Sequence, residues 1–131
     1  MATAEKKRIW GWMAFDWATQ PFYTLGLTFI FGPYFAGVAT DLFSAQGMDN
    51  ATADARAQAV WSTGQTMAGL FIAFVGPILG AYADSTGRRM PWIVAFSAVF
   101  IAASWALWLM VPDGGALWLC LFAFSIAFIA A

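Results

Sequence analysis

Long stretches without a single charge are the feature that most constrains the fold of this chain. There are four of them: 24 residues after Asp16, 27 after Arg56, 23 after Arg89 and 18 after Asp113. A helix needs roughly 20 apolar residues to cross about 30 Å of hydrocarbon. Hydrophobic residues make up 62% of the chain and charged residues 10%, against about 25% charged residues in a soluble domain. The sequence therefore predicts an all-α membrane protein, folded as a bundle of transmembrane helices.

These stretches predict helices over residues 13–42, 58–83, 91–111 and 116–131. The last is expected to be cut short, because it is shorter than a full span. The apolar run behind the charged N-terminal residues is too long for a cleaved leader and indicates an uncleaved first span. Residues 43–57 are expected to form a polar external loop, in which Asp49 or Asn50 caps a helix that leads into the second span.

Lysine and arginine fix the predicted orientation, because they gather on the cytoplasmic side of membrane proteins. Lys6, Lys7 and Arg8 precede the first span, Arg88 and Arg89 lie between the second and third, and only Arg56 lies on the other side. The N-terminus and the loop after Asp84 are therefore expected in the cytoplasm. Tryptophans near the predicted span ends, such as Trp61, Trp92 and Trp118, are typical of the membrane interface, although several could equally be packing residues.

Polar residues cluster on one side of the first predicted helix. At 100° per residue, five of them fall within about 140° of arc: Asp16, Thr19, Gln20, Tyr23 and Thr24. Gln65, with Ser62 and Thr66, extends this polarity on the second helix. Such groups could line a path for a solute or proton; the alternatives are hydrogen bonding between helices and, for Asp16, an ordinary interfacial charge.

The second predicted helix carries a stripe of small residues, Gly69, Ala73, Gly76 and Gly80, at spacings of four, three and four. Small residues allow two helices to approach closely in a membrane, so this face predicts close helix packing. Pro21 and Pro33 predict kinks in the first helix, because each lacks an N–H group.

A short hairpin joins the second and third spans. Its motif consists of Gly80, Asp84, Gly87, Arg88 and Arg89. Gly87 permits the positive φ that lets a helix turn back. This pattern resembles the signature loop between helices two and three of the major facilitator superfamily. The chain departs from it at Ser85, where many members carry arginine.

A second, independent motif indicates which branch of the superfamily the chain resembles. The runs Phe15–Ala18, Gln20–Phe22 and Thr28–Phe35, together with Gly87–Trp92, look like the vacuole-effluxer-like branch of that superfamily. The resemblance covers nearly the whole chain. It implies a fold of twelve helices in two pseudo-symmetric halves, with residues 1–131 as the N-terminal part of the first six-helix half.

The resemblance also implies a function. It is that of a secondary active transporter of small solutes, working by alternating access in a bacterial inner membrane, with the remaining helices of a longer chain as partners. Fungal members are associated with amino acids, which makes them a solute class to test. The hairpin would act in gating, with Asp84 pairing with the far half of the protein at its cytoplasmic face.

Two other membrane functions compete with this one. A self-contained four-helix multidrug exporter has a similar length, but it needs a weak lysine and arginine bias and a full fourth helix. A non-transporting scaffold would explain helix packing but not the Asp84 loop. The chain has no histidine, no visible nucleophile–base pair and no metal-ligand cluster, so the sequence predicts neither an enzyme, a cofactor nor a nucleic-acid partner.

Overall fold

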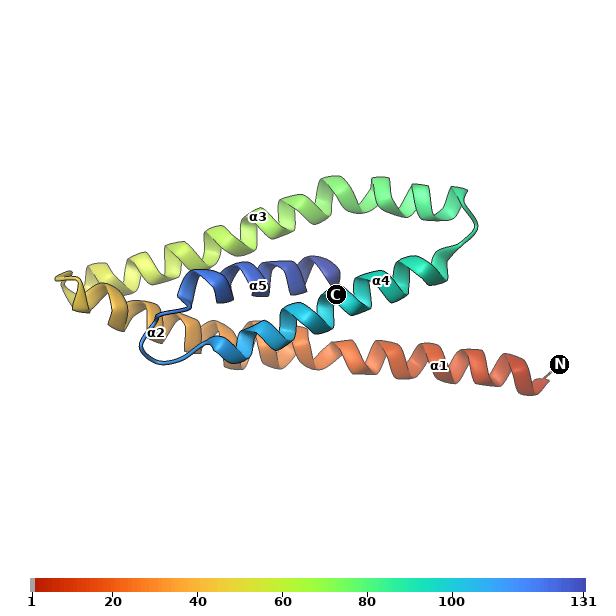
Figure 1. The fold of residues 1–131 in the computed structure, drawn as a ribbon, viewed down its shortest axis with the longest axis horizontal. Helices are drawn as coiled ribbons and strands as arrows, with labels where there is room; N and C mark the ends of the chain where they lie inside the picture. Colours follow the sequence, from red (N-terminus) through yellow and green to blue (C-terminus); the bar gives the residue numbers. More distant parts are fainter. Residues whose placement is uncertain (1) are drawn as a thin grey trace. The chain divides into compact units, whose positions relative to one another are not determined.

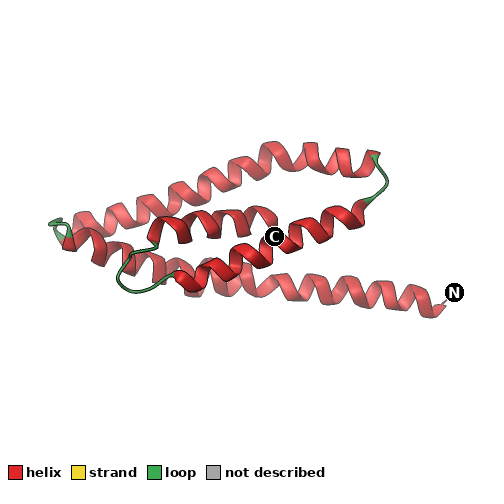
Figure 2. Cartoon of the chain, in the orientation of Figure 1, coloured by secondary structure: helices red, strands yellow, loops and turns green. Residues whose placement is uncertain are grey.

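The computed structural model describes residues 2–131, with side chains from Glu5 onward. Its helices are α1 (Ala2–Pro21), the π-helix η1 (Phe22–Ile30), α2 (Phe31–Ala45), α3 (Asn50–Ser85), α4 (Arg89–Ala106), the 3-10 turn η2 (Leu107–Leu109) and α5 (Leu117–Ala130) (Figure 1). Only short loops separate them, and the described residues contain no strand (Figure 2). The all-α prediction is confirmed. The chain divides into two compact units after Tyr34, and each is described by itself.

Three helical stretches are long and apolar enough to cross a membrane: Glu5–Ala45, Asn50–Ser85 and Arg89–Leu109. Large apolar side chains stand exposed along them, including Phe74 and Ile78 on α3 and Ile101 on α4. Exposed apolar surface of this extent is unfavourable in water and favourable against lipid chains. The structure is therefore compatible with an integral membrane protein.

The first unit differs from the single kinked α-helix expected over residues 13–42. α1 ends at Pro21, and a nine-residue π-helix follows it. At the end of this segment the N–H of Phe31 donates to the carbonyl of Gly26, five residues back. The hydroxyl of Thr28 likewise lies 3.4 Å from the carbonyl of Tyr23. Pro21, the last residue of α1, lacks an N–H and interrupts the α-helical ladder directly before this segment. The predicted kinks at Pro21 and Pro33 stay predictions.

The turn between α2 and α3 is much shorter than the expected loop over residues 43–57. Only residues 46–49 lie outside helices, and Gly47 has a φ of 92°. Asp49 caps α3, as predicted, because its carboxylate accepts the N–H of Thr52 at 3.1 Å. Hydrogen bonding from the side chain and backbone of Thr52 lowers the pKa of Asp49. The cap therefore persists at neutral pH and weakens as the pH falls through that lowered pKa.

The core of the second unit contains three aromatic rings from three helices. The ring of Trp61 on α3 lies 5.2 Å from that of Phe35 on α2 and 5.0 Å from that of Phe124 on α5. Phe35 and Phe124 are fully buried. Trp61 is therefore a packing residue, whereas Trp118 is largely exposed, as a residue at a membrane interface can be. α5 also packs against both α3 and α4.

A close approach of a glycine to another helix occurs at Gly64, outside the predicted stripe. A Cβ on Gly64 of α3 would lie 2.8 Å from Cδ1 of Leu121 on α5. On the stripe, a Cβ at Gly69 or Gly80 would meet nothing within 4 Å, and one at Gly76 would meet only Ile72 of its own helix. Within the described residues, close packing on α3 thus occurs nearer its N-terminal end. The close-packing role expected of the stripe stays a prediction.

A bend in α3 has a local cause. Pro77 lies inside this helix, where its missing N–H frees the carbonyl of Ala73 and its ring crowds the preceding turn. Figure 1 shows α3 changing direction along its length.

Candidate functional site

The hairpin between α3 and α4 brings together four of the predicted gating residues, Asp84, Gly87, Arg88 and Arg89, whereas Gly80 lies inside α3. α3 ends at Ser85, Thr86 caps it, and Gly87 has a φ of 63°. The N–H of Gly87 donates to the carbonyl of Asp84 at 3.1 Å, and that of Thr86 to the carbonyl of Tyr82 at 3.2 Å. The predicted left-handed glycine is confirmed. It matters because a side chain at this φ would be strained.

Asp84 has an ion-pair partner inside its own hairpin. Its Oδ1 atom lies 2.8 Å from Nε of Arg89, the first residue of α4. Both side chains are largely exposed, at 60% for Asp84 and 73% for Arg89. An exposed pair of this kind stabilises a fold by only about 0–1 kcal/mol. The pair can therefore orient the carboxylate while leaving it able to change partner.

Aromatic rings join the two helices next to this turn. The ring of Tyr82 meets that of Trp92 edge to face, with centroids 5.9 Å apart. Trp92 in turn stacks on Phe96 at 6.2 Å. Sequence reasoning assigned Tyr82 no role. The sequence does place one aromatic residue on each side of the glycine turn, Tyr82 before it and Trp92 after it, and this pattern could have predicted their contact. Such an aromatic pair stabilises a fold by about 0.5–1.5 kcal/mol beyond the burial of its surface.

The polar side chains near the N-terminal half of α3 fall into two kinds. The hydroxyls of Ser62, Thr63 and Thr66 donate to carbonyls of their own helix, at 3.1, 2.7 and 2.8 Å. The amide of Gln65 differs, because both its oxygen and its nitrogen are buried without a hydrogen-bond partner. Of these side chains, Gln65 is the one whose polar atoms have no hydrogen-bond partner, and both atoms are buried. Its place on a solute path stays a prediction.

Replacing Gln65 by leucine is expected to stabilise the chain. Leucine keeps a similar volume and removes two buried polar atoms, each of which costs about 1–3 kcal/mol when it is unpaired. Thermal unfolding in detergent should show a higher midpoint for Gln65→Leu. Thr66→Val is the matched control, because it removes a hydroxyl already bonded to its own helix. A lower midpoint for Gln65→Leu than for the control would show that the amide has a partner in solution.

The remaining predicted path residues lie in the first unit, and Gln65 lies in the second. Asp16, Gln20 and Thr24 are exposed, and Tyr23 is half-buried. The backbone carbonyl of Asp16 accepts the hydroxyl of Thr19 at 2.9 Å. The prediction that these side chains share one face of about 140° of arc requires one continuous α-helix. It does not hold beyond Pro21, because Tyr23 and Thr24 belong to the π-helix and follow a different angular spacing.

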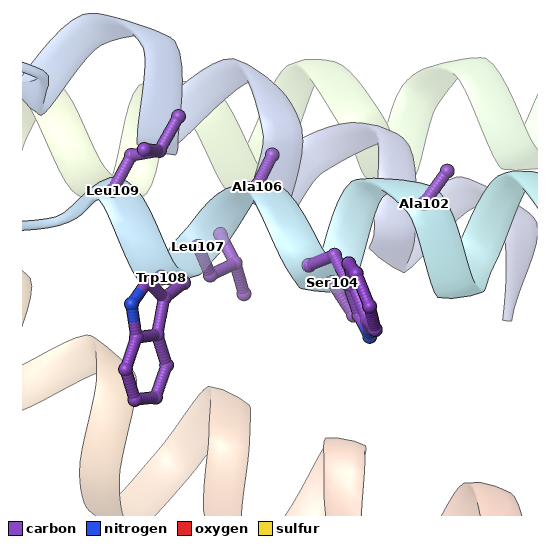
Figure 3. Close-up of a pocket in the computed structure, with 7 residues that line it drawn as sticks. Ala102, Ser104, Ala106, Leu107, Trp108 and Leu109 are labelled. Atoms are coloured by element: carbon purple, nitrogen blue, oxygen red, sulfur yellow. The ribbon is translucent and has the colours of Figure 1, made fainter.

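A hollow that sequence reasoning missed lies along the end of α4 and the turn η2. It is lined by Ala102, Ser104, Trp105, Ala106, Leu107, Trp108 and Leu109. In Figure 3 the indole of Trp108 and the side chain of Leu109 point to opposite sides of the backbone. The Trp108 side chain is 90% exposed, whereas the hydroxyl of Ser104 is buried without a partner. The lining is thus apolar apart from one hydroxyl and the indole N–H groups.

Among the described side chains, no group of three or more histidine, cysteine, aspartate or glutamate residues is arranged to hold a metal ion. Comparisons with protein-family models, curated proteins and solved structures give no match for this chain.

Proposed function

We propose that this chain is part of a secondary active transporter of small solutes that works by alternating access. The observation that carries the proposal is the α3–α4 hairpin. A positive-φ glycine, an acidic residue at a helix end and two arginines lie together between two apolar helices long enough to span a membrane. The same residues carry the resemblance to the major facilitator superfamily and its vacuole-effluxer-like branch.

In the proposed mechanism Asp84 exchanges partners as the cytoplasmic side opens and closes. The local pair with Arg89 holds the carboxylate at the helix end. In the closed state, a basic group or helix N-terminus of the far half would take over this carboxylate. A contact made in only one state biases the equilibrium between the two states. Because the local pair is exposed and weak, such an exchange costs little.

The function is tested by counterflow in proteoliposomes made with the full-length protein. A panel of radiolabelled amino acids is the first solute class to try. Alternating access predicts that unlabelled solute inside the vesicle accelerates uptake of the same labelled solute, because the loaded carrier returns faster than the empty one. Uptake without this acceleration would indicate a channel and contradict the proposal.

Cysteine labelling tests the proposed orientation. After Cys120→Ala removes the native thiol, a cysteine at position 50 should react with an impermeant reagent from outside. One at position 86 should react only after the membrane is opened. The reason is the bias of five basic residues to one across the predicted spans. Equal labelling of both positions from outside would instead favour a dual-orientation small exporter.

A further inference from the structure

We propose that the π-helix Phe22–Ile30 is a hinge, which interconverts between π and α hydrogen bonding and so turns α1 about its axis relative to residues 31–34. This inference goes beyond the proposed transport function. It concerns the backbone of the first unit and holds for any solute.

The hydrogen bonds define an unusual segment. The backbone N–H of Phe31 donates to Gly26, five residues back, and the hydroxyl of Thr28 reaches the carbonyl of Tyr23, also five residues back. π-helices are rare and occur mostly as single turns inside α-helices, often at functional sites. In a segment of nine residues, several backbone N–H groups can each move their hydrogen bond from the carbonyl five residues back to the carbonyl four residues back.

Two prolines explain why this change of register can stay local. Pro21 ends α1 just before the segment, and Pro33 follows it by three residues. Neither has an N–H group, so the helical ladder is already interrupted near both ends. The bonds between the prolines can therefore shift from five-residue to four-residue spacing without breaking bonds in α1 or in the rest of α2.

The shift changes the direction of polar side chains. A π-helix and an α-helix differ in the rotation per residue. When the nine residues of the π-helix change to α-helical hydrogen bonding, the preceding helix α1 therefore turns about its axis. Asp16 and Gln20 precede the segment, and Tyr23 and Thr24 lie within it. The hinge would therefore change how these side chains are oriented relative to one another.

Gly26 offers a variant that shifts the balance without a clash. A Cβ at this position would meet only Phe22 of its own helix, at 3.7 Å, which is ordinary van der Waals contact. Alanine has the highest α-helix propensity and glycine one of the lowest. Gly26→Ala should therefore favour the α register. Gly11→Ala is the matched control, because Gly11 lies in α1 with nothing within 4 Å of its added Cβ.

Pulsed electron paramagnetic resonance in lipid nanodiscs measures the register directly. The protein with Cys120→Ala carries spin labels at position 14, before the segment, and at position 30, the last residue of the segment. Sixteen residues of α-helix span about 24 Å, and the same number that includes a π-helix spans less. A second protein, labelled at positions 51 and 67 of α3, supplies the distance for an uninterrupted α-helix.

The hinge predicts two distances for labels 14 and 30, one shorter than the α3 distance and one equal to it. Gly26→Ala should move population from the shorter to the longer distance, and Gly11→Ala should leave the populations unchanged. A single distance that Gly26→Ala does not change would overturn the proposal. These distances are measured without any transport assay. The experiment can therefore contradict the hinge and leave the proposed transport function untouched, and a failed transport assay would leave the hinge untouched.

Discussion

Replacing Gly64 by leucine is expected to disrupt the packing between α3 and α5. Even a Cβ at this position would lie 2.8 Å from Cδ1 and 3.3 Å from Cγ of Leu121. A full leucine side chain must therefore push α5 away. Overpacking a well-packed contact costs about 1–3 kcal/mol and occasionally more. Thermal unfolding in detergent should show a clear fall in the midpoint for Gly64→Leu.

The matched control is Gly69→Leu, on the same helix but facing open space, because a Cβ there meets nothing within 4 Å. Its midpoint should stay close to that of the unchanged chain. Leu121→Ala in the Gly64→Leu background should recover part of the loss, since it removes the side chain that clashes. A double-mutant cycle on these two positions measures their coupling. Equal effects at Gly64 and Gly69 would show that α5 does not pack where the structure places it.

Asp84→Asn is expected to slow transport by the full-length protein strongly, while leaving its folding nearly unchanged. The only ion pair that this carboxylate makes in the described residues is with Arg89, and both side chains are largely exposed. Losing that pair should cost at most about 1 kcal/mol of stability. If the carboxylate instead holds the cytoplasmic side closed in the working protein, its loss shifts the population toward the inward-open state. Counterflow and cysteine accessibility measure the two effects.

Arg89→Gln separates the local role of Asp84 from the proposed gating role. It breaks the same ion pair but leaves the Asp84 carboxylate in place. Gating through a distant partner predicts a much smaller transport defect for Arg89→Gln than for Asp84→Asn. If the two variants are equally impaired, the local pair alone explains the effect. A change in solute affinity without any change in accessibility would contradict a gating role for Asp84.

Features set by local properties could be predicted from the sequence. Apolar stretches without charges are helical because a chain in lipid must satisfy its backbone hydrogen bonds internally, and the observed helices contain most of the expected ranges. The turn at Gly87 was predictable because only glycine adopts a positive φ without strain. The cap at Asp49 was predictable because a carboxylate there accepts the N–H two or three residues on. Each depends on a few neighbouring residues.

Features that depend on which helices meet could not be predicted in this way. The small-residue stripe pointed to Gly69 and Gly80, yet Gly64 faces Leu121, because the position of α5 along α3 decides where a side chain would clash. Trp61 could have faced the interface, but Phe35 and Phe124 enclose it. Ser62 and Gln65 are both polar residues of one helix. The bond of Ser62 to its own helix is a local property, but only the surrounding packing determines that the Gln65 amide is buried without a partner.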